Sequence, residues 1–183
     1  MGVELISETF PELLPMQGRS PGVHVSEVIH DLATRLGHYE ARDEITPEAR
    51  CMMELGCALE DAVIDRLTRH SPGRYVQPGE LELDDIYGTP DLLDIDDYAI
   101  EECKLTWMSS NHDPDSEKFW RYWVQLKSYC RMAGSSLGRL RVAFVMGDYK
   151  GSGPQYRVWE ARFSDDELAE NWAMIRTRAR SMR

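Results

Sequence analysis

The stretch 88–104 constrains the fold of this 183-residue chain most strongly, because its charged residues stand within a pattern typical of β-strands. It reads GTPDLLDIDDYAIEECK, with Asp91 directly after a proline and an acidic turn between two apolar runs. Successive side chains of a strand point to opposite faces, so Glu102 and Lys104 share one face and Glu101 lies on the other. We therefore expect a hairpin in which two carboxylates and one ammonium converge.

Phosphodiester hydrolysis is the chemistry that needs such a trio. Carboxylate oxygens of Asp91 and Glu102 would hold a divalent cation such as Mg²⁺, which would polarise the phosphate for in-line attack by water. Lys104 would position that water. Burial lowers the pKa of a lysine while neighbouring carboxylates raise it, so a role of Lys104 in proton transfer stays open.

Length and composition indicate one globular domain. A chain of 183 residues with 42% hydrophobic and 29% charged residues can bury a sizeable core. Residues 1–21, rich in proline and glycine, read as an irregular arm, and 22–183 as a single domain. The sequence contains no apolar run of membrane-spanning length and no basic-then-apolar leader, so we expect a cytoplasmic protein with no membrane partner.

The net charge of −11 argues against a broad nucleic-acid-binding surface. A metal site can neutralise its own carboxylates, and a narrow groove can still be lined by basic side chains. A ring-shaped homo-oligomer would also hold DNA by enclosing it rather than by charge.

The four cysteines show no close pairing in sequence and are expected as buried reduced thiols, with no iron–sulfur cluster. The five tryptophans are expected in the core or at the edges of grooves, more than as stacking platforms for bases.

Hydrophobic periodicity and capping residues predict the order of the elements. We expect a short helix capped by Ser26, a longer one from Pro47 to His70 with an apolar stripe that includes Leu55, and three antiparallel strands over 75–105. Next we expect a helix that starts at Asp113-Pro114 and ends at Gly134. Strands over 140–146 and 155–163 come after it, and Ser164 and Glu167 open the last helix.

The order helix, three strands, helix, strand, with Pro90-Asp91 and Glu102-Cys103-Lys104 on the strands, resembles the PD-(D/E)XK nuclease superfamily. Gly56 to Glu60 looks like its GxxxE motif, and Gln125 to Tyr129 like its QxxxY motif, both typical of the lambda-exonuclease and RecB-like branch. The resemblance covers about 22–163, and its specificity comes from the order of the four motifs. It implies a restriction-endonuclease-like α/β core, in which helices flank a mixed central sheet, and a nuclease-like domain over 22–183.

The resemblance also implies roles for single residues. Glu60, Asp91, Glu102 and the backbone carbonyl of Cys103 would bind Mg²⁺, for which Mn²⁺ could substitute. Lys104 would be catalytic together with Asp91 and Glu102. Gln125 and Tyr129, which share a helix face because they are four residues apart, would position the substrate strand or support Lys104.

Structural alternatives stand beside several of these roles. Glu60 could be a solvated helix carboxylate, although a small Gly56 one turn earlier would let this helix approach a sheet closely. Gln125 and Tyr129 could simply hydrogen-bond to each other. The acidic stretch 94–97 lacks the glycine of a calcium-binding loop and is expected to be a solvated turn.

The resulting expectation is a Mg²⁺-dependent deoxyribonuclease, an exonuclease that works on DNA ends in phage-type recombination or repair, with a recombination protein as a partner. The alternatives are a nuclease-fold module that binds DNA or protein without cleavage, and a restriction-type endonuclease.

Overall fold

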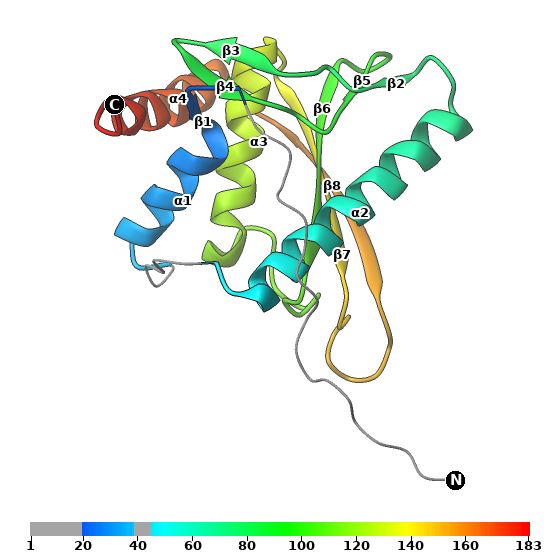
Figure 1. Ribbon diagram of the computed structural model, residues 1–183. Coiled ribbons are helices and arrows are strands. Elements are labelled where there is room, and N and C mark those ends of the chain that lie inside the picture. Colours follow the sequence, from blue (N-terminus) through cyan, green and yellow to red (C-terminus); the bar gives the residue numbers. More distant parts are fainter. Residues whose placement is uncertain (1–19, 39–44) are drawn as a thin grey trace, which may run out of the picture.

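The computed structural model describes residues 20–38 and 45–183, so the expected arm over 1–21 lies almost wholly outside the described residues. Figure 1 shows the arrangement of the elements. In chain order they are β1 (Val23–His24), α1 (Val25–Arg35), α2 (Pro47–His70), β2 (Tyr75–Val76), β3 (Leu81–Leu83), β4 (Ile86–Gly88), β5 (Leu92–Asp94), β6 (Ala99–Thr106), the 3₁₀ helix η1 (Glu117–Phe119), α3 (Trp120–Ala133), β7 (Leu137–Phe144), β8 (Gln155–Arg162) and α4 (Asp165–Arg180).

Two sheets organise the fold. The larger has the strand order β2-β5-β6-β7-β8, in which only β6 and β7 are parallel. The smaller has the order β1-β4-β3. The expected mixed α/β class is therefore confirmed, since α3 connects two parallel neighbours within an otherwise antiparallel sheet.

The prediction of three antiparallel strands over 75–105 was wrong. The structure has five strands there, four of them of two or three residues, divided between the two sheets. Asp84 and Asp85 both have positive φ angles, of 54° and 56°, and form the tight turn between β3 and β4. The chain then changes sheet between Gly88 and Leu92, so Asp91 lies at the crossing from one sheet to the other.

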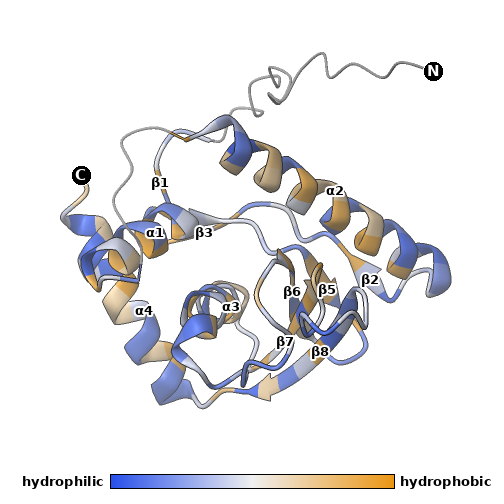
Figure 2. Cartoon of the chain, turned by 90° about the horizontal axis from the view of Figure 1, so that it is seen from below, coloured by the Kyte–Doolittle hydropathy of each residue, from blue (hydrophilic) through white to orange (hydrophobic). Residues whose placement is uncertain are grey.

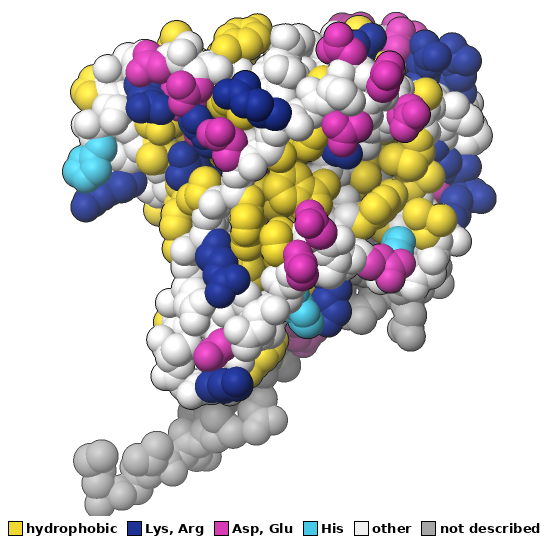
Figure 3. Space-filling view, turned by 180° about the vertical axis from the view of Figure 1, so that it is seen from behind, with side chains coloured by type: hydrophobic (Ala, Val, Ile, Leu, Met, Phe, Trp, Pro, Cys, Tyr) yellow, Lys and Arg dark blue, Asp and Glu magenta, His cyan; other side chains and the backbone are white. Residues whose placement is uncertain are grey.

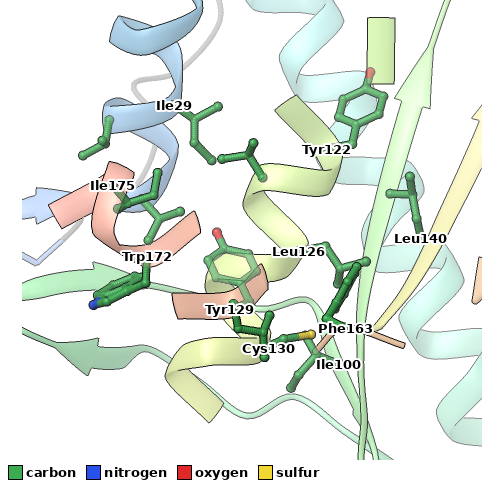
Figure 4. Packing of buried hydrophobic residues seen from close by; sticks show 14 of the residues in the cluster. Ile29, Ile100, Tyr122, Leu126, Tyr129, Cys130, Leu140, Phe163, Trp172 and Ile175 are labelled. Atoms are coloured by element: carbon green, nitrogen blue, oxygen red, sulfur yellow. The ribbon is translucent and has the colours of Figure 1, made fainter. Parts of the chain in front are cut away.

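Helix α3 occupies the centre of the molecule. It contacts β6 and β7 on one side and α1 and α4 on the other (Figures 1 and 2). The side chains between these layers form one buried cluster, part of which is shown in Figure 4. Leu126 and Cys130 of α3 pack there with Ile100 of β6 and Ile175 of α4, and all four are fully buried. This packing holds α3 rigidly against the strand that carries Glu102 and Lys104.

Two helix starts differ from expectation. Helix α1 is capped at His24 rather than Ser26, because β1 ends there and the Glu27 carboxylate accepts a hydrogen bond of 3.2 Å from the His24 amide. Helix α3 begins at Trp120 rather than at Asp113, since the Asp113 carboxylate accepts from the amide of Asp115 in a turn instead. The remaining helix ends agree with the sequence, including the left-handed Gly134 after α3.

The expected apolar stripe of α2 is only partly buried, since its members Leu59, Val63 and Leu67 are half-buried and none is fully buried. Ile64 is the one buried residue among the helix's described positions, and Leu55 is 47% exposed. Among the described residues, helix α2 makes its main contacts with β6 and β2 of the larger sheet, so much of its surface is not covered by another layer (Figure 2). No helix within 20–38 and 45–183 combines the length and the apolar character needed to cross a membrane.

Candidate active site

Strand β6 carries the central pair of the candidate site. Glu102 is 1% exposed, and the Lys104 ammonium donates a hydrogen bond to its Oε1 atom. The two side chains share a face of the strand, as alternation predicts, and Glu101 lies on the opposite face with Arg139 and Arg141.

Asp91 is bound directly to this strand. Its Oδ2 atom accepts a hydrogen bond of 2.6 Å from the backbone amide of Cys103, the residue between Glu102 and Lys104. Asp91 is buried at 8% exposure. The connection between the two sheets is thereby fastened at the middle of β6, and the Asp91 carboxylate lies close to both charged side chains.

Glu60 reaches the same place from α2. Burial, followed by the charge of Asp91 and a hydrogen bond with it, raises the pKa of Glu60 to about 8. The expectation that the small size of Gly56 lets α2 approach the sheet was wrong, because a Cβ atom on Gly56 would meet nothing within 4 Å. The length and direction of α2 across β6 bring Glu60 to the site, and the size of Gly56 does not.

Glu102 is a carboxylate with an unused oxygen. Burial and then the charge of Asp91 raise its pKa to about 8, although the nearby Lys104 opposes the shift. Its Oε2 atom is buried and has no hydrogen-bond partner among the described residues. A buried carboxylate oxygen without a partner is costly, and a cation at this point would remove that cost.

Lys104 stays positively charged. Burial lowers its pKa, but the charges of Glu102 and Asp91 and the hydrogen bond to Glu102 outweigh burial and raise the pKa above its usual value. The two opposing effects expected from the sequence are therefore resolved in favour of the ammonium form. Such a group can donate hydrogen bonds and attract anions at neutral pH, but it is a poor proton acceptor.

Gln125 and Tyr129 of α3 line the same cavity and are hydrogen-bonded to each other. The Gln125 Nε2 atom donates to the Tyr129 hydroxyl at 3.0 Å. Burial raises the pKa of Tyr129, which therefore stays a neutral phenol. Its ring packs against Gly88, where a Cβ atom would come within 2.6 Å of Cε1. The mutual hydrogen bond matches the structural alternative, and direct contact with a substrate stays a prediction.

All these side chains open onto one cavity of about 380 Å³. Sequence reasoning missed several of its lining residues, above all His24, which is 6% exposed and whose Nε2 atom lies 2.9 Å from the carbonyl of Ser20. No pairing in the sequence singled out this histidine, because the elements that bring it here are far from β6 along the chain. A larger hollow of about 690 Å³ lies elsewhere and contains none of the predicted site residues.

The carboxylates do not form a closed cage. Within the described residues, no group of three His, Cys, Asp or Glu side chains is arranged so that it could hold a metal ion as it stands. Mg²⁺ commonly uses one or two carboxylates and completes its coordination with water and substrate phosphate. An open set of carboxylate oxygens with one unsatisfied atom therefore fits this ion better than it fits a structural metal.

The opposite face of the sheet carries a separate network of ion pairs. Asp94 is fully buried and accepts from Arg74 at 2.6 Å and from Arg139 at 2.5 Å, so the prediction of a solvated turn was wrong for this residue. Glu101 is likewise fully buried and accepts from Arg139 and Arg141. These acids have basic partners, whereas Glu102 has an unused oxygen.

The cysteines partly depart from expectation. All four are free thiols, but Cys57 is exposed, and only Cys103 and Cys130 are buried. Burial raises the pKa of both buried thiols. The carbonyl of Cys103 as a metal ligand stays a prediction.

No protein-family model matches the sequence, and no curated protein is significantly similar to it. Solved structures do share its fold. The alkaline exonuclease LHK-Exo from Laribacter hongkongensis superposes with a TM-score of 0.55 at 15% identity, over 88% of this chain and 87% of that chain.

A phage-related exonuclease from Haemophilus somnus 129PT also gives a TM-score of 0.55, at 14% identity over 86% of this chain and 79% of that chain. A second structure of LHK-Exo, in complex with dAMP, gives 0.53 at 14% identity over 88% and 87% of the two chains. The fold expected from the four motifs is confirmed, because this chain has the fold of exonucleases.

Proposed function

We propose that this protein is a Mg²⁺-dependent deoxyribonuclease that removes nucleotides from DNA ends. The observation that carries the proposal is the meeting of Asp91, Glu102 and Lys104 with Glu60 around one cavity, where Glu102 retains a buried oxygen without a partner. Because one fold can serve many functions, the proposal depends on these side chains rather than on the shared fold.

The residues that would hold the metal are Glu60, Asp91 and Glu102, with the carbonyl of Cys103. When bound, Mg²⁺ or Mn²⁺ would polarise the phosphate and offset negative charge that develops on its oxygens. The high pKa values of Glu60 and Glu102, both about 8, express the repulsion and desolvation that a cation would relieve.

Lys104 would act as a fixed cation beside the scissile phosphate. Its ammonium has three donors, of which one is used by Glu102, so further donors remain for a phosphate oxygen or for the attacking water. Its raised pKa favours this positioning role over proton abstraction. Gln125 and Tyr129 would keep the wall of the cavity next to Lys104 in place through their mutual hydrogen bond.

The proposal of an exonuclease rests on the solved structures of other proteins that share this fold. Those cited are exonucleases, and one of them was solved with dAMP, the kind of product that stepwise removal of nucleotides releases. The net charge of −11 disfavours a wide DNA-binding face, which is consistent with an enzyme that grips a strand end or encloses DNA as a homo-oligomer. Phage-type recombination or repair, with a recombination protein as partner, would supply such ends.

The deciding experiment compares linear duplex, linear single-stranded and covalently closed circular DNA, each with Mg²⁺, Mn²⁺ or EDTA. We expect metal-dependent release of mononucleotides from linear DNA and none from circles. Cleavage of circles would instead indicate a restriction-type endonuclease. Binding without cleavage in any metal would indicate a non-cleaving nuclease-fold module.

A matched pair of variants links the activity to the site. Glu60→Gln should lose cleavage, whereas Asp61→Asn, at the exposed position next to it, should keep the wild-type rate. Equal activity of the two variants would show that the Glu60 carboxylate is not needed for cleavage.

A further inference from the structure

The larger sheet ends in a long open edge formed by β8. This strand has eight residues, and within 20–38 and 45–183 its one partner is β7, over the unbroken register from Leu137 opposite Arg162 to Phe144 opposite Gln155. It contains neither a bulge nor a proline, two devices by which natural edge strands avoid pairing with another chain. At the other end of the sheet, β2 is only two residues long.

The backbone groups that face this edge can be identified. The amide of Phe163 bonds to the carbonyl of Ser136 on the β7 side, and in an antiparallel pair these bonds recur at every second residue. The amides and carbonyls of Tyr156, Val158 and Glu160 therefore point outward. Within the described residues, no backbone hydrogen bond uses these outward groups.

An apolar groove of about 690 Å³ lies directly beside this edge, between β8, α3 and α4. Its floor contains half-buried aromatic side chains from two of these elements, Trp120 and Trp123 of α3 and Trp159 of β8. Figure 3 shows this face of the molecule, where hydrophobic side chains gather in a hollow with acidic side chains around it. An extended segment that paired with β8 would direct alternate side chains into this groove.

The rim of the groove is acidic. Glu117, Glu160, Glu167 and Glu170 line it, against the basic side chains of Lys127 and Arg162. Among the described residues, Glu170 takes part in no ion pair, whereas Glu160 is paired with Arg139 and Glu167 with Lys127. A second copy of this chain would bring like charges together here, and nucleic acid would be repelled, so the charge favours a basic polypeptide.

We propose that β8 and the adjoining groove bind an extended segment of a protein partner that has an apolar residue at every second position and basic residues at its ends. The segment adds a strand to the open edge and places its apolar side chains over Trp120, Trp123 and Trp159, while its basic ends lie against the acidic rim. Main-chain hydrogen bonds supply affinity, and the groove and its charges supply specificity. This surface shares no residue with the cavity that contains Lys104.

The test uses the full chain and a synthetic nine-residue peptide in which valine alternates with threonine between two lysines at each end. Binding is measured by fluorescence anisotropy and by tryptophan emission. Three controls accompany it: the same peptide with glutamate in place of lysine, the same peptide N-methylated at alternate amides, and the variant Val158→Pro. This substitution removes an outward amide and leaves the bonds to β7 intact, and Val158→Thr is its conservative match.

We expect micromolar binding of the lysine peptide, a loss of about tenfold or more with Val158→Pro or with N-methylation, and no loss with Val158→Thr. Glu170→Lys should also weaken binding, and it keeps the proposal testable if the proline variant does not fold. Nuclease activity should not change in any variant. The proposal would be overturned if the wild type did not bind the peptide at about 1 mM, which is the weakest affinity worth assigning. It would also be overturned if Val158→Pro and the wild type bound the peptide equally well. A wild-type dimer in sedimentation that Val158→Pro converts to a monomer would overturn it as well, because the edge would then be occupied by a second copy.

Discussion

Glu101 and Glu102 are adjacent, equally buried carboxylates, and the structure predicts opposite consequences for the same substitution. Glu101 accepts from Arg139 and Arg141, whereas Glu102 has an oxygen without a partner and a raised pKa. Glu101→Gln should therefore keep cleavage and lose stability, and Glu102→Gln should lose cleavage and become more stable relative to the wild type as pH rises from 5 to 8.

The magnitudes follow from the contacts. Arg141 is 11% exposed and has Glu101 as its one carboxylate partner among the described residues, so Glu101→Gln should lower the free energy of unfolding by about 2 to 4 kcal/mol. In the folded protein the pKa of Glu102 is raised from its usual 4.5 to about 8, so its ionisation opposes folding as pH rises between these values. Glu102→Gln also removes the ion-pair partner of Lys104 at every pH. The pKa shift therefore predicts a change with pH: the unfolding free energy of the variant relative to the wild type should rise by about 1 to 3 kcal/mol from pH 5 to pH 8.

Urea unfolding in EDTA at pH 5 and pH 8, followed by circular dichroism, measures these changes, and a gel assay in Mg²⁺ measures cleavage. Glu102→Gln should lower the cleavage rate by several orders of magnitude, because it removes an expected metal ligand. A stability difference from the wild type that is the same at both pH values would refute the assignment of Glu102 as a strained buried acid. Full activity in Glu102→Gln, or lost activity in a folded Glu101→Gln, would refute the assignment of Glu102 to the candidate active site and of Glu101 to the opposite face of β6.

Three further predictions test other parts of the structure. Lys104→Met should reduce cleavage by about 10²- to 10³-fold with little change in DNA affinity, and Michaelis kinetics that show a change in KM alone would contradict the positioning role. Gly88→Ala should cost about 1 to 3 kcal/mol of stability and lower activity, because the new Cβ atom would lie 2.6 Å from the Tyr129 ring. An unchanged melting temperature would show that this contact is looser than described. Asp94→Asn should destabilise the protein by about 3 kcal/mol, since the fully buried carboxylate pairs with two arginines, and calorimetry at neutral pH that finds no loss would argue against this network.

The strand alternation of β6 was readable from the sequence because it depends only on local backbone geometry. The period of two separated Glu102 and Lys104 from Glu101 without knowledge of any other element. The capping residues of α4 and the glycine after α3 were equally local, and the structure agrees with them. These features could be predicted because they depend only on residues that are close together along the chain.

Contacts between distant segments could not be read in this way. The burial of Asp94 depends on Arg74 and Arg139, which lie 20 and 45 residues away along the chain. The same is true of His24 in the candidate active-site cavity and of the incomplete burial of the apolar stripe of α2. Periodicity shows that a helix has an apolar face, but only tertiary packing decides whether another layer covers that face.

The sequence by itself therefore determined which residue types the chain presents, on which side of β6 they stand, and in what order the motifs follow. The tertiary structure alone decided that α2, the crossing at Asp91 and α3 meet at β6, that Glu102 retains an oxygen without a partner, and that β8 ends the sheet with its edge open. The reason is physical: alternation and capping act over a few residues, whereas burial, charge pairing and pKa depend on which segments pack together in space.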